Sequence, residues 1–281
     1  MIPEAEAKKF LEELGITKLP VIPRDICKRL GILYCEEPLK NIDGFLIVDP
    51  KSGNSLICVN SLIKEPGRKN FTVAHELGHF CMDSLNQSCS KEVIESRKQK
   101  NPPIELMANE YAAELLMPTP IYQRLINTRS PGWGNIKELA AIGQTSLLST
   151  ALKFIDLTDY ACALIISEGS QISWFHKSEM FSAVIDMDSK ILSPHTYAYA
   201  AFNGLIPPND FETVKADNWL SGRGVKPNTE ILEWTLPLNS YGQVFTLLLD
   251  EEGIGGLEED DDDDNEIEWE PPTFHKSKRK K

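Results

Sequence analysis

The chain has 281 residues, of which 41% are hydrophobic and 25% charged, and its formal net charge is −13 at pH 7. This composition is typical of a globular protein with one large or two modest domains. The longest apolar stretches, at 161–166 and 244–249, are far too short to cross a bilayer. The acidic N-terminus lacks the basic start and apolar run of a signal peptide, so we expect a cytoplasmic protein without membrane association.

The negative charge is concentrated near the C-terminus. Residues 251–281 hold twelve Asp or Glu against five Lys or Arg and few apolar side chains, which predicts a disordered acidic tail with a basic end. Neither the tail nor the rest of the chain favours direct binding of nucleic acid.

The six cysteines form no C-x-x-C pair. This pattern favours free, buried thiols in a reducing compartment over disulfides or a thiolate metal site.

The first part of the chain alternates between helical and strand patterns. A helical pattern stops at Gly15, and a second short helix begins near Pro23 and ends at Gly31. Residues 44–50 and 55–61 then read as two strands joined by a turn.

A loop at 64–70 leads into residues 71–80, which read FTVAHELGHF. After a long polar connection at 83–103, the segment 103–117 predicts a helix that ends before Pro118.

The sequence pattern changes twice beyond residue 120. Residues 121–158 contain short helical patterns, and residues 159–250 contain apolar strand patterns that predict a mainly antiparallel α+β domain. We therefore expect an α+β fold with domains at 1–120, 121–158 and 159–250, followed by the tail at 251–281.

The decapeptide FTVAHELGHF has the spacing of a metal site. His75 and His79 lie one helical turn apart, so both imidazoles can reach a single zinc ion. Glu76 lies about 100° around the helix, within reach of a metal-bound water, as in the H-E-x-x-H metallopeptidases whose glutamate is the general base. Gly78, beneath the imidazoles, is expected to leave room for an approaching group. The alternative is a buried helix whose histidines find other partners.

A catalytic zinc needs three protein ligands and an open position, and the helix at 103–117 offers Glu105, Glu110 and Glu114. At about 100° per residue, Glu110 and Glu114 point away from the apolar arc of that helix, whereas Glu105 lies beside it with Asn109 one turn below. An inward carboxylate without a cation is costly. Glu105 is therefore the predicted third ligand.

These segments resemble the ImmA/IrrE metallopeptidases. The resemblance is carried by VNS, GRKNFTVAHELGHF and ANEYAAELLMP within residues 55–118, and it extends more loosely over 1–250. It implies a thermolysin-like zincin domain, with the H-E-x-x-H helix on a small antiparallel sheet, then a helical region resembling a helix-turn-helix and a GAF-like C-terminal α+β domain.

The same resemblance implies the residues of the site. It assigns the metal to His75, His79 and Glu105 and the general base to Glu76, with Zn²⁺, or Mn²⁺ or another divalent ion in its place, as cofactor. The members of this family cleave helix-turn-helix transcriptional repressors in bacterial cells, which derepresses mobile-element or stress-response genes. The implied partner is thus a repressor protein.

Two other functions stay open. The chain could disarm a repressor by sequestration, with a structural or vestigial metal site and no cleavage. Alternatively, residues 137–154 could form a DNA-binding helix-turn-helix, although Lys137 and Lys153 are the only basic residues in that stretch. The candidates for a second oxyanion donor, which the sequence does not place, are Tyr111, His176, His195 and Tyr241.

Overall fold

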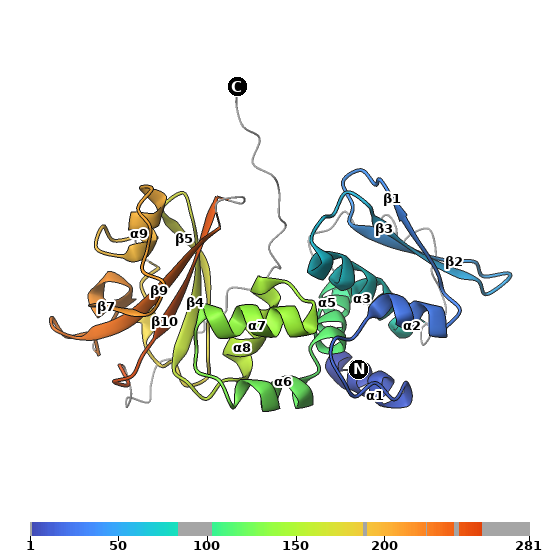
Figure 1. Ribbon diagram of the computed structural model, residues 1–281, viewed down its shortest axis with the longest axis horizontal. Coiled ribbons are helices and arrows are strands. Elements are labelled where there is room, and N and C mark those ends of the chain that lie inside the picture. Colours follow the sequence, from blue (N-terminus) through green and yellow to red (C-terminus); the bar gives the residue numbers. More distant parts are fainter. Residues whose placement is uncertain (1, 84–102, 188–189, 223, 239–241, 255–281) are drawn as a thin grey trace, which may run out of the picture. The chain divides into compact units, whose positions relative to one another are not determined.

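The computed structural model describes residues 2–83, 103–187, 190–222, 224–238 and 242–254 (Figure 1). The predicted connection at 83–103 and the predicted acidic tail lie almost wholly outside these residues. Within the described part of the chain, none of the helices combines the length and the apolar character needed to cross a membrane.

The chain divides into two compact units, each made of two segments. The first unit consists of Met1–Leu125 and Lys137–Thr150, and the second consists of Ile126–Ile136 and Ala151–Lys281. The predicted domain boundaries at residues 120, 158 and 250 remain predictions.

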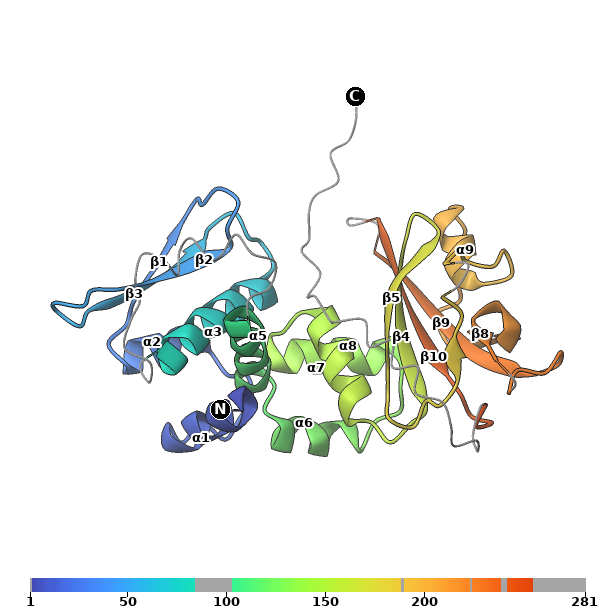
Figure 2. The same ribbon diagram turned by 180° about the vertical axis from the view of Figure 1, so that it is seen from behind.

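Helices dominate the first unit. It contains α1 (Pro3–Glu13), α2 (Pro23–Arg29), α3 (Pro66–Asp83) and α5 (Pro103–Leu116), and three further helices, α6 (Thr119–Ile126), α7 (Trp133–Gly143) and α8 (Leu147–Leu157), are divided between the units. Helix α5 packs between α1 and α3 (Figure 2). The predicted helices in this region are thus present, although α3 begins five residues earlier than expected.

The early start of α3 has a physical cause. Pro66 occupies the first turn, where its fixed φ suits a helix and its missing N–H costs no hydrogen bond. Arg68 then donates two hydrogen bonds of 2.8 Å to the carboxylate of Asp43, and Lys69 pairs with Glu36 at 2.5 Å. These ion pairs join the first turns of the helix to the small sheet, so residues that read as a loop are helical.

The small sheet has three strands, β1 (Leu33–Glu37), β2 (Gly44–Val48) and β3 (Ser55–Asn60), in the order β1-β3-β2. β2 pairs with β3 in the expected antiparallel sense, but β1 pairs with β3 in parallel. The expectation of a small antiparallel sheet is therefore correct for β2 and β3, but the parallel strand β1 was not predicted. The chain reverses direction after β1 and again after β2, so β1 and β3 run the same way when they become neighbours.

One face of this sheet carries the helices. Helix α2 contacts β1, and α3 contacts β2 and β3. A Cβ on Gly44 would lie 2.5 Å from Cγ2 of Thr72 and 3.0 Å from the carbonyl oxygen of Cys58. The close approach of α3 to the sheet therefore depends on a glycine at this position.

The second unit is built on a five-stranded sheet in the order β5-β4-β10-β9-β7. Its strands are β4 (Cys162–Glu168), β5 (Gln171–Lys177), β7 (Glu212–Lys215), β9 (Glu230–Leu238) and β10 (Gln243–Leu249). All neighbouring strands are antiparallel, as predicted for this region.

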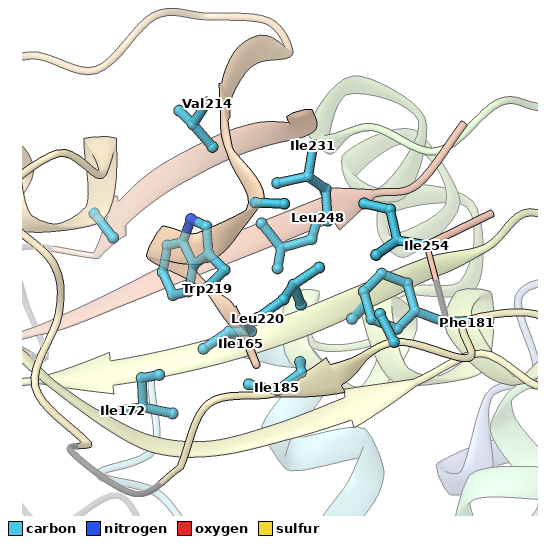
Figure 3. Packing of buried hydrophobic residues seen from close by; sticks show 14 of the residues in the cluster. Ile165, Ile172, Phe181, Ile185, Val214, Trp219, Leu220, Ile231, Leu248 and Ile254 are labelled. Carbon is cyan, nitrogen blue, oxygen red and sulfur yellow. The ribbon is translucent and has the colours of Figure 1, made fainter. Parts of the chain in front are cut away.

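The two faces of this sheet are covered by different segments. A hydrophobic core on one face joins the sheet to the chain between β5 and β9, which includes β6 (Val184–Ile185), α9 (Tyr197–Phe202), the 3₁₀ turn η1 (Ala216–Asn218) and β8 (Leu220–Ser221). Trp219 and Phe181 are its largest fully buried side chains (Figure 3). On the other face the rings of Trp133 and Phe245 lie 6.1 Å apart, and Trp133 Nε1 donates to the carbonyl oxygen of Trp234.

A buried carboxylate ties the covering segments to the sheet. Glu233 of β9 is only 1% exposed, and its oxygens accept hydrogen bonds from the backbone N–H of Ala198 at 2.9 Å, from Trp219 Nε1 at 3.0 Å and from Thr235 Oγ1 at 2.8 Å. Burial raises the pKa of Glu233 above its ordinary value, although these hydrogen bonds lower it in part. The residue therefore links α9 and Trp219, which directly follows η1, to the sheet.

The raised pKa predicts a pH-dependent stability. Because the folded chain holds the Glu233 proton more tightly than the unfolded chain, this contribution is complete below the unfolded pKa and is lost as pH rises through the folded pKa. Glu233→Gln removes the titration. We expect the free energy of unfolding of the wild type, measured relative to the variant, to fall as the pH rises. The fall amounts to about 1.4 kcal/mol for each tenfold difference between the proton affinities of the folded and the unfolded chain. Urea unfolding of both chains from pH 4 to 8 measures this, and a difference that grows with pH would contradict it.

Candidate metal centre

Two helices of the first unit bring three potential ligands together. On α3, the Nε2 atoms of His75 and His79 lie 3.0 Å apart. From α5, Glu105 places Oε2 3.2 Å from His75 Nε2 and Oε1 3.5 Å from His79 Nε2. The structure therefore joins the residues that the sequence singled out, and among the described residues they form a His/Cys/Asp/Glu group with ligand atoms close enough to hold one metal ion.

The separations of these ligand atoms fit a tetrahedral ion. With ligand bonds of about 2.0–2.1 Å, the donor atoms of a tetrahedral zinc site lie about 3.3–3.4 Å from each other. The three observed separations, 3.0, 3.2 and 3.5 Å, lie close to this value. Two neutral imidazoles and one carboxylate are also a donor set that zinc and manganese accept. The residues present thus fit a divalent ion in both geometry and chemistry.

Asn109 fixes the orientation of one ligand. His75 Nδ1 lies 2.9 Å from Asn109 Oδ1, and an amide oxygen can only accept, so the ring carries its proton on Nδ1 and donates it. The ring therefore presents Nε2 to His79 and Glu105, and a metal ion bound there would take the place of a proton on that atom.

The charge of Glu105 is favoured by its surroundings. Hydrogen bonds with His75 and then with His79 hold the pKa of Glu105 well below its usual range, although burial acts in the opposite direction. The carboxylate is thus ionised at neutral pH and available as an anionic ligand.

Glu76 lies on the same turn of α3 as both histidines and is 4% exposed. Its buried carboxylate lies about 100° around the helix from His75.

Gly78 has a different role from the one expected. A Cβ on this residue would lie 3.2 Å from Cδ1 of Tyr111 and 3.3 Å from the carbonyl oxygen of Ala108, both on α5. The glycine therefore allows α3 and α5 to pack closely, which brings Glu105 near the histidines, instead of leaving space for a ligand. Its absent side chain is a signal of close helix packing that the sequence alone does not distinguish from an open site.

The other acidic residues of α5 do not join the cluster. Glu114 is buried, and its carboxylate accepts hydrogen bonds from the backbone N–H and the hydroxyl of Thr119 at 2.8 and 2.6 Å, at the start of α6. The helical wheel placed Glu114 away from the apolar arc of α5, but the residue is only 4% exposed, so this expectation was wrong for Glu114, and its capping role was missed. The sequence signal for this capping role is an acidic residue a few positions before Thr119-Pro120, where the next helix begins.

The candidate oxyanion donors are in separate places. Tyr111 is fully buried and its ring lies 6.4 Å from that of Phe10. His176, which pairs with Asp156 at 2.5 Å, and the exposed His195 belong to the second unit. Tyr241 lies outside the described residues. None of the described candidates is thereby placed at the metal ligands.

Helices α7 and α8 are joined by a short turn, which packs against the start of α3. The side-chain amide of Asn70, on α3, donates to the carbonyl oxygen of Gln144 at 3.1 Å. A Cβ on Gly67 would lie 2.6–2.8 Å from the backbone of Thr145 and Ser146. These contacts give the turn a structural role at the start of α3.

We predict that Asn109→Leu weakens zinc affinity by about 10–100-fold, because the partner that orients a ligating histidine is lost. Asn109→Asp keeps an acceptor at Oδ1 and is expected to restore most of the affinity. Competition with a chromophoric chelator measures both constants without any substrate. Equal affinities for the wild type and the leucine variant would contradict the orienting role of Asn109.

Comparison with known proteins agrees with the site. Residues 27–140, which include His75, Glu76, His79 and Glu105, match a family model described as the IrrE N-terminal-like domain. A solved structure described as a Mycobacterium tuberculosis transcriptional regulator is similar, with a TM-score of 0.54, 13% identity, and coverage of 88% of this chain and 75% of that one. At this identity the likeness concerns the fold alone. No curated protein sequence matches the chain.

Proposed function

Because the chain belongs, through residues 27–140, to the ImmA/IrrE family, we propose that it is a metal-dependent endopeptidase that cleaves a helix-turn-helix transcriptional repressor. The observation that carries the proposal is the convergence of His75, His79 and Glu105, whose ligand atoms lie 3.0–3.5 Å apart, beside a buried carboxylate at Glu76.

The roles of the residues follow from their chemistry. His75, His79 and Glu105 would hold the divalent ion, zinc or in its place manganese or another divalent metal. When bound, the ion supplies Lewis-acid chemistry, because it lowers the pKa of a water molecule and withdraws charge from the peptide carbonyl. The Glu76 carboxylate accepts a proton from the attacking water and then delivers it to the nitrogen of the leaving amine as the C–N bond breaks.

The family relationship supports a repressor as the substrate, and with it a role in derepressing mobile-element or stress-response genes in the cytoplasm. The leading alternative is a protein that binds and sequesters the repressor without cutting it. The two functions differ in stoichiometry: a peptidase inactivates many repressor molecules per chain, whereas a sequestering protein inactivates at most as many as it binds.

Co-expression with candidate helix-turn-helix repressors from the same genome tests the proposal. We expect a shortened repressor fragment on a gel, and purified chain at a tenth of the repressor concentration should convert all of it. A metal chelator should stop the conversion, and added Zn²⁺ or Mn²⁺ should restore it. A repressor that stays intact while its DNA binding is lost in proportion to added chain would instead support sequestration.

A further inference from the structure

Two cysteines stand directly opposite each other on neighbouring strands of the small sheet. Cys35 of β1 and Cys58 of β3 are register partners in the parallel pairing, and both are free thiols. Adjacent strands lie about 4.8 Å apart, which falls within the Cα separation of about 4.4–6.8 Å that a disulfide requires. Register partners also point to the same face of a sheet, so the two thiols share one side.

That side is the face away from α3. Gly44, which contacts α3, is paired with Val59, and side chains alternate along a strand, so Cys58 points to the opposite face. On this face the side chains of Leu33 and Ile47 are 64% and 51% exposed. At these positions solvent reaches the face on which the cysteines lie.

The two thiols differ in access and are in contact. Cys58 is 1% exposed, whereas Cys35 is half-buried. Burial and a hydrogen bond with Cys35 raise the pKa of the Cys58 thiol to about 11. Cys58 therefore stays protonated next to a partner that solutes can reach, and Cys35 is the thiol that meets a reagent first.

We propose that Cys35 and Cys58 form a redox-active dithiol, which a hydroperoxide converts to an intramolecular disulfide and which a thiol reductant restores. This inference is independent of the proposed peptidase activity. The Cys35 sulfur takes one oxygen from the hydroperoxide, whose O–O bond breaks and releases water or an alcohol, and becomes a sulfenic acid. The Cys58 sulfur then displaces the hydroxyl, which leaves with the Cys58 proton as water. The two sulfurs together lose two electrons to the peroxide.

The accessibility of the pair favours reversibility. Because Cys35 is only half-buried, a reducing thiol can reach a disulfide between Cys35 and Cys58, and exposed disulfides are more easily reduced than buried ones. The dithiol is therefore suited to cycle between its two states instead of forming a permanent cross-link.

Peroxide treatment of the reduced, folded full chain tests this proposal. After hydrogen peroxide, alkylation and digestion without reductant, mass spectrometry should find peptides joined through Cys35 and Cys58, lighter by two hydrogen atoms than the sum of the reduced peptides. Dithiothreitol should separate them and return both thiols to alkylation. Cys35 found as a sulfinic acid, or joined to any other cysteine, while Cys58 remains a thiol would overturn the proposal.

Variants separate the pair from general oxidation. Cys35→Ser should abolish the peroxide-dependent loss of the Cys58 thiol, and Cys58→Ala should leave Cys35 to proceed to over-oxidised forms. Cys27→Ser, which removes a buried thiol of α2, is the matched control and should form the Cys35–Cys58 disulfide at the wild-type rate. Oxidation of Cys58 at an unchanged rate in Cys35→Ser would show that the two cysteines do not act together.

Discussion

Glu76→Gln is expected to lower the rate of repressor cleavage by about 10²–10⁴-fold, the contribution typical of a general base. Glutamine has nearly the same shape as glutamate but cannot accept a proton at neutral pH. Since Glu76 is not among the three metal ligands, the variant should keep one bound ion per chain. Cleavage of purified repressor, followed by the appearance of fragments over time, measures the rate, and elemental analysis measures the metal.

The control for this variant is Glu12→Gln, the same chemical change at an exposed position of α1, which should leave both readouts at wild-type values. A Glu76→Gln chain that is folded, holds its metal and still cuts the repressor at the wild-type rate would remove Glu76 from the mechanism. If neither the wild type nor Glu76→Gln cuts the repressor, but both block its activity equally, sequestration is the function. The metal measurement is needed because lost cleavage could otherwise follow from a lost ion.

The part of the site that the sequence predicts is the part set by helical periodicity. His75 and His79 are one turn apart in any helix, so their shared direction follows from spacing alone. Glu105 was selected among the glutamates of α5 because it lies beside the apolar positions of that helix, although Glu114, on the opposite arc, is also buried. Each of these inferences needs only the geometry of a single helix.

The features that were missed depend on contacts between segments distant in sequence. Whether Gly78 opens a cavity or admits another helix depends on what lies opposite, which is Tyr111. The parallel pairing of β1 with β3 depends on where β2 goes, since a local pattern gives the strand but not its neighbour. Glu233 is a charged residue within a strand pattern, and its three donors are in α9, directly after η1 and in its own strand. Nothing near it in the sequence indicates that it is buried.

Glu105→Ala is expected to reduce metal affinity by more than about 100-fold, beyond the loss caused by removing an outer hydrogen-bond partner. The two histidines alone leave a divalent ion with half of a tetrahedral coordination shell from the protein. The carboxylate is also the ligand that carries a negative charge, since its pKa is held low by both histidines. Competition with a chelator and the metal content after dialysis measure the change without a substrate.

The matched control is Glu110→Ala, the same truncation five residues later on the same helix, which the helical geometry directs away from the histidines. This variant should bind metal as the wild type does. Wild-type affinity in Glu105→Ala would show that the short distances between Glu105 and the histidines reflect only their mutual hydrogen bonds. Together with Glu76→Gln, the result separates binding from chemistry: one variant should hold the ion without cutting, and the other should fail to cut because it holds no ion. If the metal had only a structural role, Glu76→Gln would leave the rate of repressor cleavage unchanged.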